Sequence, residues 1–424
     1  MDASEAQSGG PRVLFLTREP VVHQRGGSTT YVLGLLELLR AHGAKVTLVA
    51  TSAYSRSPRL FFRVIEDARG IALRFPGYLR VGGLYVCPFR LKAWARALAR
   101  VAARKVWLRG VSAALERMFA GGLYTGAWDL TVPTPLESEA AVRAAEATGA
   151  TVVIANYCFW GPLFADGRLG KRRTAILMHD LLSARVQRFR EAGLPLDSPA
   201  ISEAEEMRWL SAAESVLAAQ ESEAKLIRPR VSSRVLVMPI TLRPKALDPE
   251  RVVPGRCLFV GSNILPNQTG LHFLLESVWP RVRAEVPGAT LAVAGTVGES
   301  LGEGGLQALG VDLLGVVESL EEEYARAAVC VVPLLVGTGI KIKLVEALGF
   351  GKAVVSTRVG VEGLEPWASQ GVEIADDGEA FAAAIVRLLN DERLRHQRET
   401  AALQMAEEHF HAGVLNPEFV WAVL

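Results

Sequence analysis

Two lysines and a glutamate follow a glycine-containing loop within residues 335–363, LVGTGIKIKLVEALGFGKAVVSTRVGVEG. Small residues in such a loop let an anionic group approach the amides at a helix start. Lys343 precedes Glu346 by about one turn, so both side chains can share one face of a helix. A cation and amides suit a diphosphate, and a carboxylate suits the two hydroxyls of a ribose. The segment predicts a nucleotide diphosphate site, with Lys341 the weaker candidate because it lies on another face. Taken alone, a solvated Lys–Glu pair beside turn glycines explains the same residues.

Other polar candidates lie in the first half of the chain. His179 could donate a hydrogen bond to a substrate hydroxyl, and Asp180 could orient it, bind an acceptor or cap the next helix. Arg185 could meet an anionic group on the acceptor side. Gly26 and Gly27 could donate amides to phosphate or sugar. A packed histidine, a helix cap and an ordinary loop are the plain alternatives.

These candidates follow segments that read as buried strands. Ser28 is the expected cap of a helix over 29–41, which leads from the first strand to the second. Further helices are expected near 268–286 and over 378–410. In an open parallel sheet, ligands bind at the carboxyl ends of the strands, where the candidates fall. The expected strands are 12–17, 45–50, 151–155, 174–178, 215–218 and 235–238, then 257–260, 290–294, 311–314, 329–332, 353–357 and 372–375.

The repeated strand–helix order predicts an α/β chain with two Rossmann-like parallel-sheet domains facing across a cleft. Its 424 residues are enough for two cores. Prolines between residues 229 and 254 favour a linker there. The expected divisions are a disordered N-terminus at 1–10, a first domain at 11–240, a linker at 241–255, a second domain at 256–405, and a C-terminal helix at 406–424 that packs back on the first domain.

Composition narrows the class of protein. The net charge of +2 gives no reason to expect a nucleic-acid partner, and we expect none. The N-terminus lacks the apolar core of a signal peptide. No apolar run reaches the length of about 18 residues that a membrane-spanning helix needs. The four cysteines have neither metal-ligand nor redox spacing, so a cytoplasmic chain with reduced thiols and no metal site is expected.

Residues 90–109, RLKAWARALARVAARKVWLR, contain many cations and no acidic residue. Their apolar residues recur at roughly helical spacing. A basic amphipathic helix of this kind can lie on an anionic membrane surface, which makes the inner face of the membrane a candidate location. A solvated basic face is the alternative.

The chain resembles the family-4 glycosyltransferases, which are retaining enzymes with the glycosyltransferase-B fold. The resemblance is carried by LFVGSNILPNQTGLHFLLESVWPRV and GTGIKIKLVEALGFGKAVVSTRVGVEGL, and more loosely by RGGSTTYVLGLLELLRAHGAKVTLV and MHDLLSAR. It implies a donor nucleotide sugar held mainly by the second domain and an acceptor on the first. The G-x-G-x-x-G fingerprint of nicotinamide dehydrogenases does not follow the first strand.

The resemblance also assigns roles to single residues. Glu346 is expected on the ribose and Lys343 near the diphosphate, where it also stabilises the leaving group, while His179 approaches the donor sugar. One departure from the family pattern is Thr338, which stands where a sugar-facing glutamate is usual. The full expected donor-binding set is Gly26, Gly27, Gly261, Asn263, Thr338, Gly339, Ile340, Lys343 and Glu346.

The expected function is transfer of a sugar from a nucleotide sugar to a hydroxyl of a saccharide, lipid-linked or small-molecule acceptor. Retention and independence of metals are expected with it. Two alternatives keep the fold. One is a sugar-nucleotide epimerase or hydrolase, and the other is a non-catalytic donor-binding subunit of a partner transferase.

Overall fold

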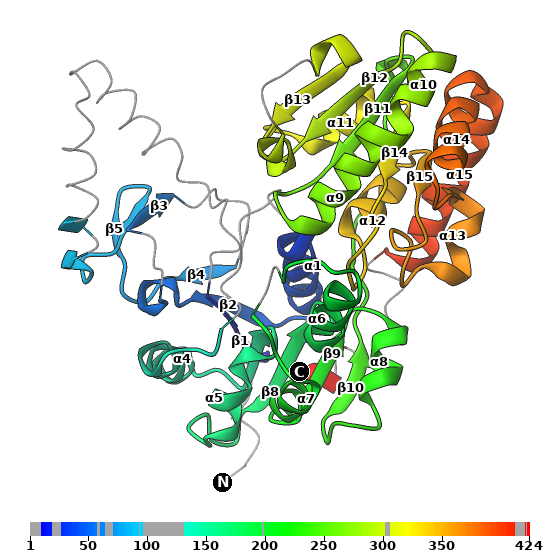
Figure 1. Ribbon diagram of the computed structural model, residues 1–424. Coiled ribbons are helices and arrows are strands. Elements are labelled where there is room, and N and C mark those ends of the chain that lie inside the picture. Colours follow the sequence, from blue (N-terminus) through cyan, green and yellow to red (C-terminus); the bar gives the residue numbers. More distant parts are fainter. Residues whose placement is uncertain are drawn as a thin grey trace.

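The computed structural model describes residues 10–18, 27–56, 60–63, 71–92, 94–95, 131–196, 199–301, 306–411, 420 and 422–424. They form two parallel-sheet domains, one above the other in Figure 1. This confirms the predicted fold class. The expected disordered N-terminus lies outside the described residues, except for Gly10.

The first domain contains a seven-stranded sheet in the order β10-β9-β8-β7-β1-β2-β4. All its neighbouring strands are parallel. Helices cover both faces, so the central strands are buried and appear in the sequence as continuous apolar runs. The strands are β1 (Arg12–Thr17), β2 (Lys45–Ala50), β4 (Ala72–Arg74), β7 (Val152–Asn156), β8 (Arg173–Met178), β9 (Ser215–Ala218) and β10 (Arg234–Val237).

The predicted cap at Ser28 is wrong. The helix α1 already begins at Gly27, and the hydroxyl of Ser28 is hydrogen-bonded to the Tyr157 side chain.

A small antiparallel sheet, in the order β3-β6-β5, was not among the expected elements. The remaining elements here are β3 (Phe61–Arg63), β5 (Leu79–Val81), β6 (Leu84–Val86), α1 (Gly27–Ala41), α4 (Pro135–Thr148), α5 (Gly161–Ala165), α6 (Leu182–Glu191), α7 (Glu203–Leu210) and α8 (Glu221–Ile227).

The second domain contains a six-stranded parallel sheet in the order β13-β12-β11-β14-β15-β16. Its strands match the expected ones closely. They are β11 (Arg256–Val260), β12 (Thr290–Ala294), β13 (Val311–Gly315), β14 (Val329–Val332), β15 (Val354–Ser356) and β16 (Val372–Ile374).

The helix expected near 268–286 begins earlier and is interrupted. A π-helical turn at Leu274–Val278 separates two helices, and Pro280 follows it in the first turn of the second. Proline has no amide hydrogen and its ring crowds the preceding turn, which accounts for the interruption. The helices of this domain are α9 (Leu265–Phe273), α10 (Trp279–Glu285), α11 (Leu320–Arg326), α12 (Ile342–Gly349), α13 (Glu365–Gly371), α14 (Gly378–Asn390) and α15 (Glu392–His409).

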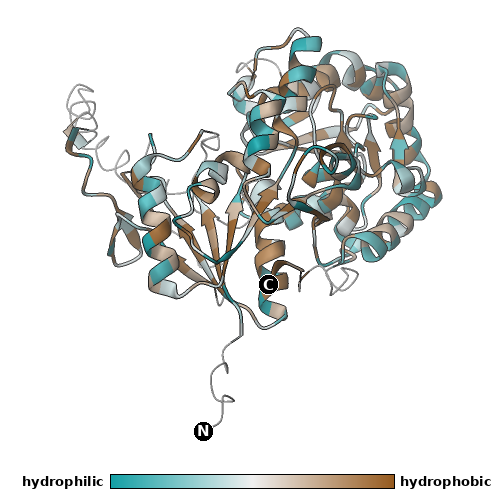
Figure 2. Ribbon diagram, turned by 90° about the horizontal axis from the view of Figure 1, so that it is seen from below, coloured by the Kyte–Doolittle hydropathy of each residue, from teal (hydrophilic) through white to brown (hydrophobic). Residues whose placement is uncertain are grey.

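The two domains touch through α1 and α12, and one cluster of buried apolar residues runs through both. Figure 2 shows the apolar residues concentrated in the strands and hydrophilic residues on the outer helices. The C-terminal residues Val420 and Val423 are buried in the same cluster. The Arg173 guanidinium of β8 donates to the Ala422 carbonyl at 2.6 Å, so the end of the chain lies on the first domain.

All four cysteines are free and buried. In the described part of the chain, none of the helices has both the length and the apolar character needed to cross a membrane.

Candidate functional site

The loop between β14 and α12 lies against the first domain. Gly337 and Gly339 have φ angles of 138° and 71°, in the region that favours glycine. A Cβ atom on Gly339 would lie 3.0 Å from the Cβ of Asp180 and 3.1 Å from the carbonyl oxygen of His179. The loop therefore brings the start of α12 directly onto the carboxyl end of β8. The side chain of Lys341 does not cap this helix start, which is a favourable place for an anion.

Lys343 lies in the first turn of α12, and its side chain is half-buried in the second domain. Its Nζ donates to Oδ1 of Asn267 at 2.5 Å and lies 4.9 Å from the centre of the Phe259 ring. Burial lowers the pKa of Lys343 to about 7, and the positive charge of Lys341 adds to the effect. An arriving phosphate would restore the charged form. Asn267, a buried residue that sequence reasoning missed, also donates to the Ser262 carbonyl at 2.8 Å and so ties Lys343 to the loop after β11.

Glu346 lies one turn further along α12 and faces the first domain. Thr30 of α1 donates to its Oε1 at 3.2 Å. Burial raises the pKa of Glu346 to about 7, against the opposing effects of the Thr30 hydrogen bond and the charge of Lys343. The contact places Glu346, the residue expected to bind the ribose, at the boundary between the domains.

Lys341 is held within the protein. Its Nζ donates to the Gly339 carbonyl at 2.5 Å and to Oε2 of Glu362 at 3.3 Å. Arg188 of α6 reaches the same glutamate from the first domain with two hydrogen bonds of 2.5 and 2.7 Å, and donates to the Gly337 carbonyl at 2.7 Å. Lys341 is therefore engaged in an ion pair with Glu362, and the choice of Lys343 for the diphosphate stays a prediction.

Thr338 and Asp180 meet across the same boundary. Thr338 Oγ1 donates to Oδ2 of Asp180 at 2.9 Å, and Arg185 Nη1 contacts that oxygen at 3.2 Å. Asp180 does not cap α6, because the cap position is Leu181. Arg185 meets a carboxylate of its own chain where the sequence had suggested an external anion.

His179 is packed among aromatic rings. It stacks on Tyr157 at 4.2 Å between ring centres and meets the edge of Tyr31 at 5.2 Å. Its Nε2 lies 2.6 Å from the side-chain amide of Asn156. Burial lowers the pKa of His179 to about 4. The ring is neutral at pH 7, so it is suited to positioning a sugar.

The amides at the start of α6 are occupied by carboxylates from elsewhere in the first domain. Glu206 accepts from the amides of Leu182 and Ser183, both at 2.8 Å, and Glu223 accepts from Leu181 at 3.1 Å. Burial raises the pKa of both carboxyls, that of Glu223 to about 8.

The structure also describes most of the other residues expected to bind the donor. Gly261 follows β11, and a Cβ there would lie 3.2 Å from Cγ of Asn267. Asn263 is exposed, and its Oδ1 accepts from Gln268 at 2.6 Å. Ile340 is half-buried next to Gly339. Gly27 is the first residue of α1, and Gly26 lies outside the described residues.

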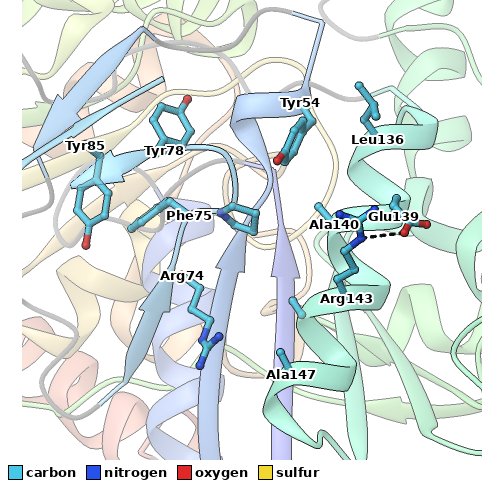
Figure 3. A pocket seen from close by; sticks show the side chains of 12 residues that line it. Tyr54, Arg74, Phe75, Tyr78, Tyr85, Leu136, Glu139, Ala140, Arg143 and Ala147 are labelled. Atoms are coloured by element: carbon cyan, nitrogen blue, oxygen red, sulfur yellow. Dashed lines mark hydrogen bonds and ion pairs between the residues drawn. The ribbon is translucent and has the colours of Figure 1, made fainter. Parts of the chain in front are cut away.

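A hollow of about 510 Å³ lies between α4 and the edge strand β4 of the first domain. Figure 3 shows rings from Tyr54, Phe75, Tyr78 and Tyr85 along one side and α4 along the other. Arg143 of α4 also lines it and pairs with Glu139. The hollow combines apolar ring faces with charged groups. None of these residues had been expected to bind a ligand.

Solved structures of low sequence identity share this architecture. Sucrose-phosphate synthase from Thermosynechococcus elongatus is 17% identical, with a TM-score of 0.65 over 97% of this chain and 96% of that one. HepE from Anabaena, solved with UDP and glucose, is 13% identical, with a TM-score of 0.59 over 96% of this chain and 97% of that one. A TarM variant from S. aureus, solved with Fondaparinux, alpha-GlcNAc-glycerol and UDP, is 8% identical, with a TM-score of 0.63 over 97% and 98%. The chain has the glycosyltransferase-B fold.

The second domain also matches at the level of sequence. Residues 254–391 match the family model described as Glycosyl transferases group 1. An uncharacterized 44.6 kDa protein in the cps region of Klebsiella pneumoniae is 30% identical over 138 residues. That match spans 30% of this chain and 36% of the relative.

Proposed function

We propose that the protein is a nucleotide-sugar-dependent glycosyltransferase. The observation that carries the proposal is the meeting of Lys343, Glu346 and the start of α12 at the boundary of the two domains, within the segment that matches group 1 glycosyl transferases. A half-buried cation and helix-start amides suit the diphosphate, and a carboxylate suits the ribose. The UDP complexes of HepE and TarM support a nucleoside diphosphate as the donor's leaving group.

The proposed reaction transfers the sugar to an acceptor hydroxyl with retention at the anomeric carbon, as in the family-4 enzymes that the sequence resembles. The bond from the anomeric carbon to the diphosphate oxygen breaks, and the bond to the acceptor oxygen forms on the same face. The acceptor proton passes to the departing phosphate oxygen. Lys343 and the amides of α12 stabilise the charge that develops on the diphosphate, so no metal ion is assigned to this step. His179, neutral at pH 7, helps to position the sugar.

We propose a saccharide or lipid-linked acceptor on the first domain. The hollow beside α4 supports a saccharide, because aromatic rings can pack on the apolar faces of sugars while the arginines contact hydroxyl or acidic groups. Closure of the two domains over the donor would exclude water and limit hydrolysis.

A calorimetric screen of nucleoside diphosphates tests the donor site. We expect at least one of ADP, GDP, UDP and dTDP to bind, and Lys343→Met and Glu346→Gln to weaken it, by up to about 3 kcal/mol for each charge-assisted bond. Lys225→Met, an exposed change on α8, is the matched control. Binding that survives both site variants unchanged would refute the assignment. Product analysis with the matching nucleotide sugar then separates transfer from hydrolysis or epimerisation.

We further propose that the small sheet docks on an anionic membrane surface at the inner face of the cell membrane. Leu79, Val81, Phe89 and Leu91 are 59%, 64%, 65% and 78% exposed, and Arg80 and Lys92 lie among them. Exposed apolar residues interspersed with cations suit the interface of anionic lipids. Most of the basic stretch 90–109 lies outside the described residues, so these neighbours carry the argument.

Co-sedimentation with vesicles of phosphatidylglycerol and phosphatidylcholine at low salt tests this surface. We expect the protein to bind, and the double variant Phe89→Ser/Leu91→Ser to bind less. Leu309→Ser, which changes a leucine 49% exposed on the second domain, should bind as the unmodified protein does. Failure of the protein to bind the vesicles would leave the basic stretch as a solvated face.

A further inference from the structure

Asp180 is a buried carboxylate at the boundary between the two domains, and it is hydrogen-bonded from both of them. It follows β8, it is 9% exposed, and it leaves the capping of α6 to other carboxylates. Its nearest polar partner is Thr338, on the loop of the opposite domain, and Arg185 of its own domain pairs with the same oxygen. An acidic side chain buried at a domain boundary is costly unless it is hydrogen-bonded, and here one of the two hydrogen bonds comes from the opposite domain.

The two hydrogen bonds of Asp180 fix the direction of its carboxylate. Thr338 at 2.9 Å and Arg185 at 3.2 Å both contact Oδ2. Within the described part of the chain, these contacts leave Oδ1 for another donor. Arg185 is itself held over the Phe189 ring at 5.3 Å, which limits the movement of the pair.

The surroundings of Asp180 belong to the proposed donor site. Thr338 lies in the loop that leads to Lys343 and Glu346. The next residue, Gly339, packs so closely against Asp180 that a Cβ on the glycine would lie 3.0 Å from the Cβ of Asp180. The neutral ring of His179 is the adjacent residue. A hydroxyl-rich group attached to a diphosphate at the start of α12 would therefore meet this carboxylate next.

We propose that Asp180 binds hydroxyls of the transferred sugar, with Thr338 as the residue that positions it. The carboxylate comes from the first domain and its positioning hydroxyl from the second, so the sugar-binding group is complete only when the domains are closed. This inference rests on the proposed function and extends it, because the sequence had placed Asp180 on the acceptor side. Recognition of the sugar is thereby coupled to closure.

The test compares each nucleoside diphosphate with its sugar conjugate. Calorimetry would use ADP, GDP, UDP and dTDP and, for whichever binds, ADP-glucose, GDP-mannose, UDP-glucose or dTDP-glucose. We expect Asp180→Asn to weaken the nucleotide sugar by about tenfold or more and to leave the nucleoside diphosphate within about twofold. Thr338→Val should act in the same direction, and Thr338→Ser should keep the affinity of the unmodified protein. Asp166→Asn, an outer carboxylate of the same domain that pairs with Arg168, is the control.

The outcomes are distinct. Equal loss for both ligands in Asp180→Asn and Thr338→Val would mean that the pair only holds the domains together, which overturns the inference. An unchanged ratio of the two affinities overturns it as well. If none of the nucleoside diphosphates binds the unmodified protein, the proposed function fails and this inference fails with it. Because Thr338→Val keeps the size and shape of the side chain, it decides the matter even if Asp180→Asn folds poorly.

Discussion

Lys343 and Glu346 are oppositely charged groups whose pKa values move toward each other in the folded protein. Burial lowers the pKa of Lys343 to about 7 and raises the pKa of Glu346 to about 7. Each charge is therefore only partly developed at neutral pH in the ligand-free protein. A diphosphate favours the charged lysine, and ribose hydroxyls favour the charged carboxylate. Ligand binding should thus be coupled to the protonation of both groups.

The affinity for a nucleotide sugar, whose diphosphate carries no group that titrates between pH 5.5 and 8.5, should pass through a maximum near pH 7. Above that pH the free protein loses the proton of Lys343, so binding must take up a proton and the affinity falls as pH rises. Below it Glu346 is protonated, so binding must release a proton and the affinity falls as pH drops. Calorimetry between pH 5.5 and 8.5, in buffers with different ionisation enthalpies, measures both effects.

The single variants separate the two limbs of this profile. Lys343→Met should remove the alkaline limb, and Glu346→Gln should remove the acidic limb. A binding constant that does not change with pH in the unmodified protein would contradict the assignment of these two groups.

Sequence reasoning found the residues of the site whose signal is local. The spacing of Lys343 and Glu346 is visible along one helix. Their partners Thr30 and Asn267 are separated from them by 316 and 76 residues, so only the fold brings them together. Thr338 and Asp180 could each be named from the sequence, but their hydrogen bond across the domains could not.

At the scale of elements, most strands were predictable because they are buried on both faces of parallel sheets. The small sheet was not, because β5 has no buried residue and each of its strands is three residues long. The π turn before Pro280 is a response of the helix to a single residue, and apolar periodicity alone does not reveal it. For the loop before α12, the glycines could be identified in the sequence, but the contact of the loop with the end of β8 could not be predicted from it.

Replacing Gly339 with alanine should push the loop away from the first domain. A Cβ there would lie 3.0 Å from Asp180 and 3.1 Å from the His179 carbonyl, closer than packed atoms normally approach. We expect the variant to bind nucleotide sugars about tenfold or more weakly, with the backbone strain adding about 1 kcal/mol of destabilisation. Isothermal titration and thermal unfolding measure the two effects.

Gly351→Ala is the matched control. Gly351 has a similar φ of 62°, and the nearest atom to its Cβ would be at an ordinary 3.5 Å. It should show the destabilisation and keep the ligand affinity. Equal affinities in the two variants would show that the contact of Gly339 with the first domain is not needed for binding.

At the scale of the whole molecule, one set of polar contacts between the domains converges on the loop before α12. Arg188 binds both the Gly337 carbonyl and Glu362, and Glu362 also holds Lys341. Burial and like charge would otherwise make a lysine at this position unfavourable. The network therefore links the contact between the domains to the conformation of the loop before α12.

Removing Arg188 should open the molecule. We expect Arg188→Met and Glu362→Gln each to raise the radius of gyration measured by small-angle X-ray scattering and to weaken nucleotide binding. Because both side chains belong to one ion pair, the radius of gyration and the affinity of the double variant should differ little from those of the more strongly affected single variant. Arg190→Met, an exposed change on the same helix, should scatter as the unmodified protein does. Scattering curves of the two single variants and the double variant that match that of the unmodified protein, or effects that simply add in the double variant, would show that this pair does not hold the domains together.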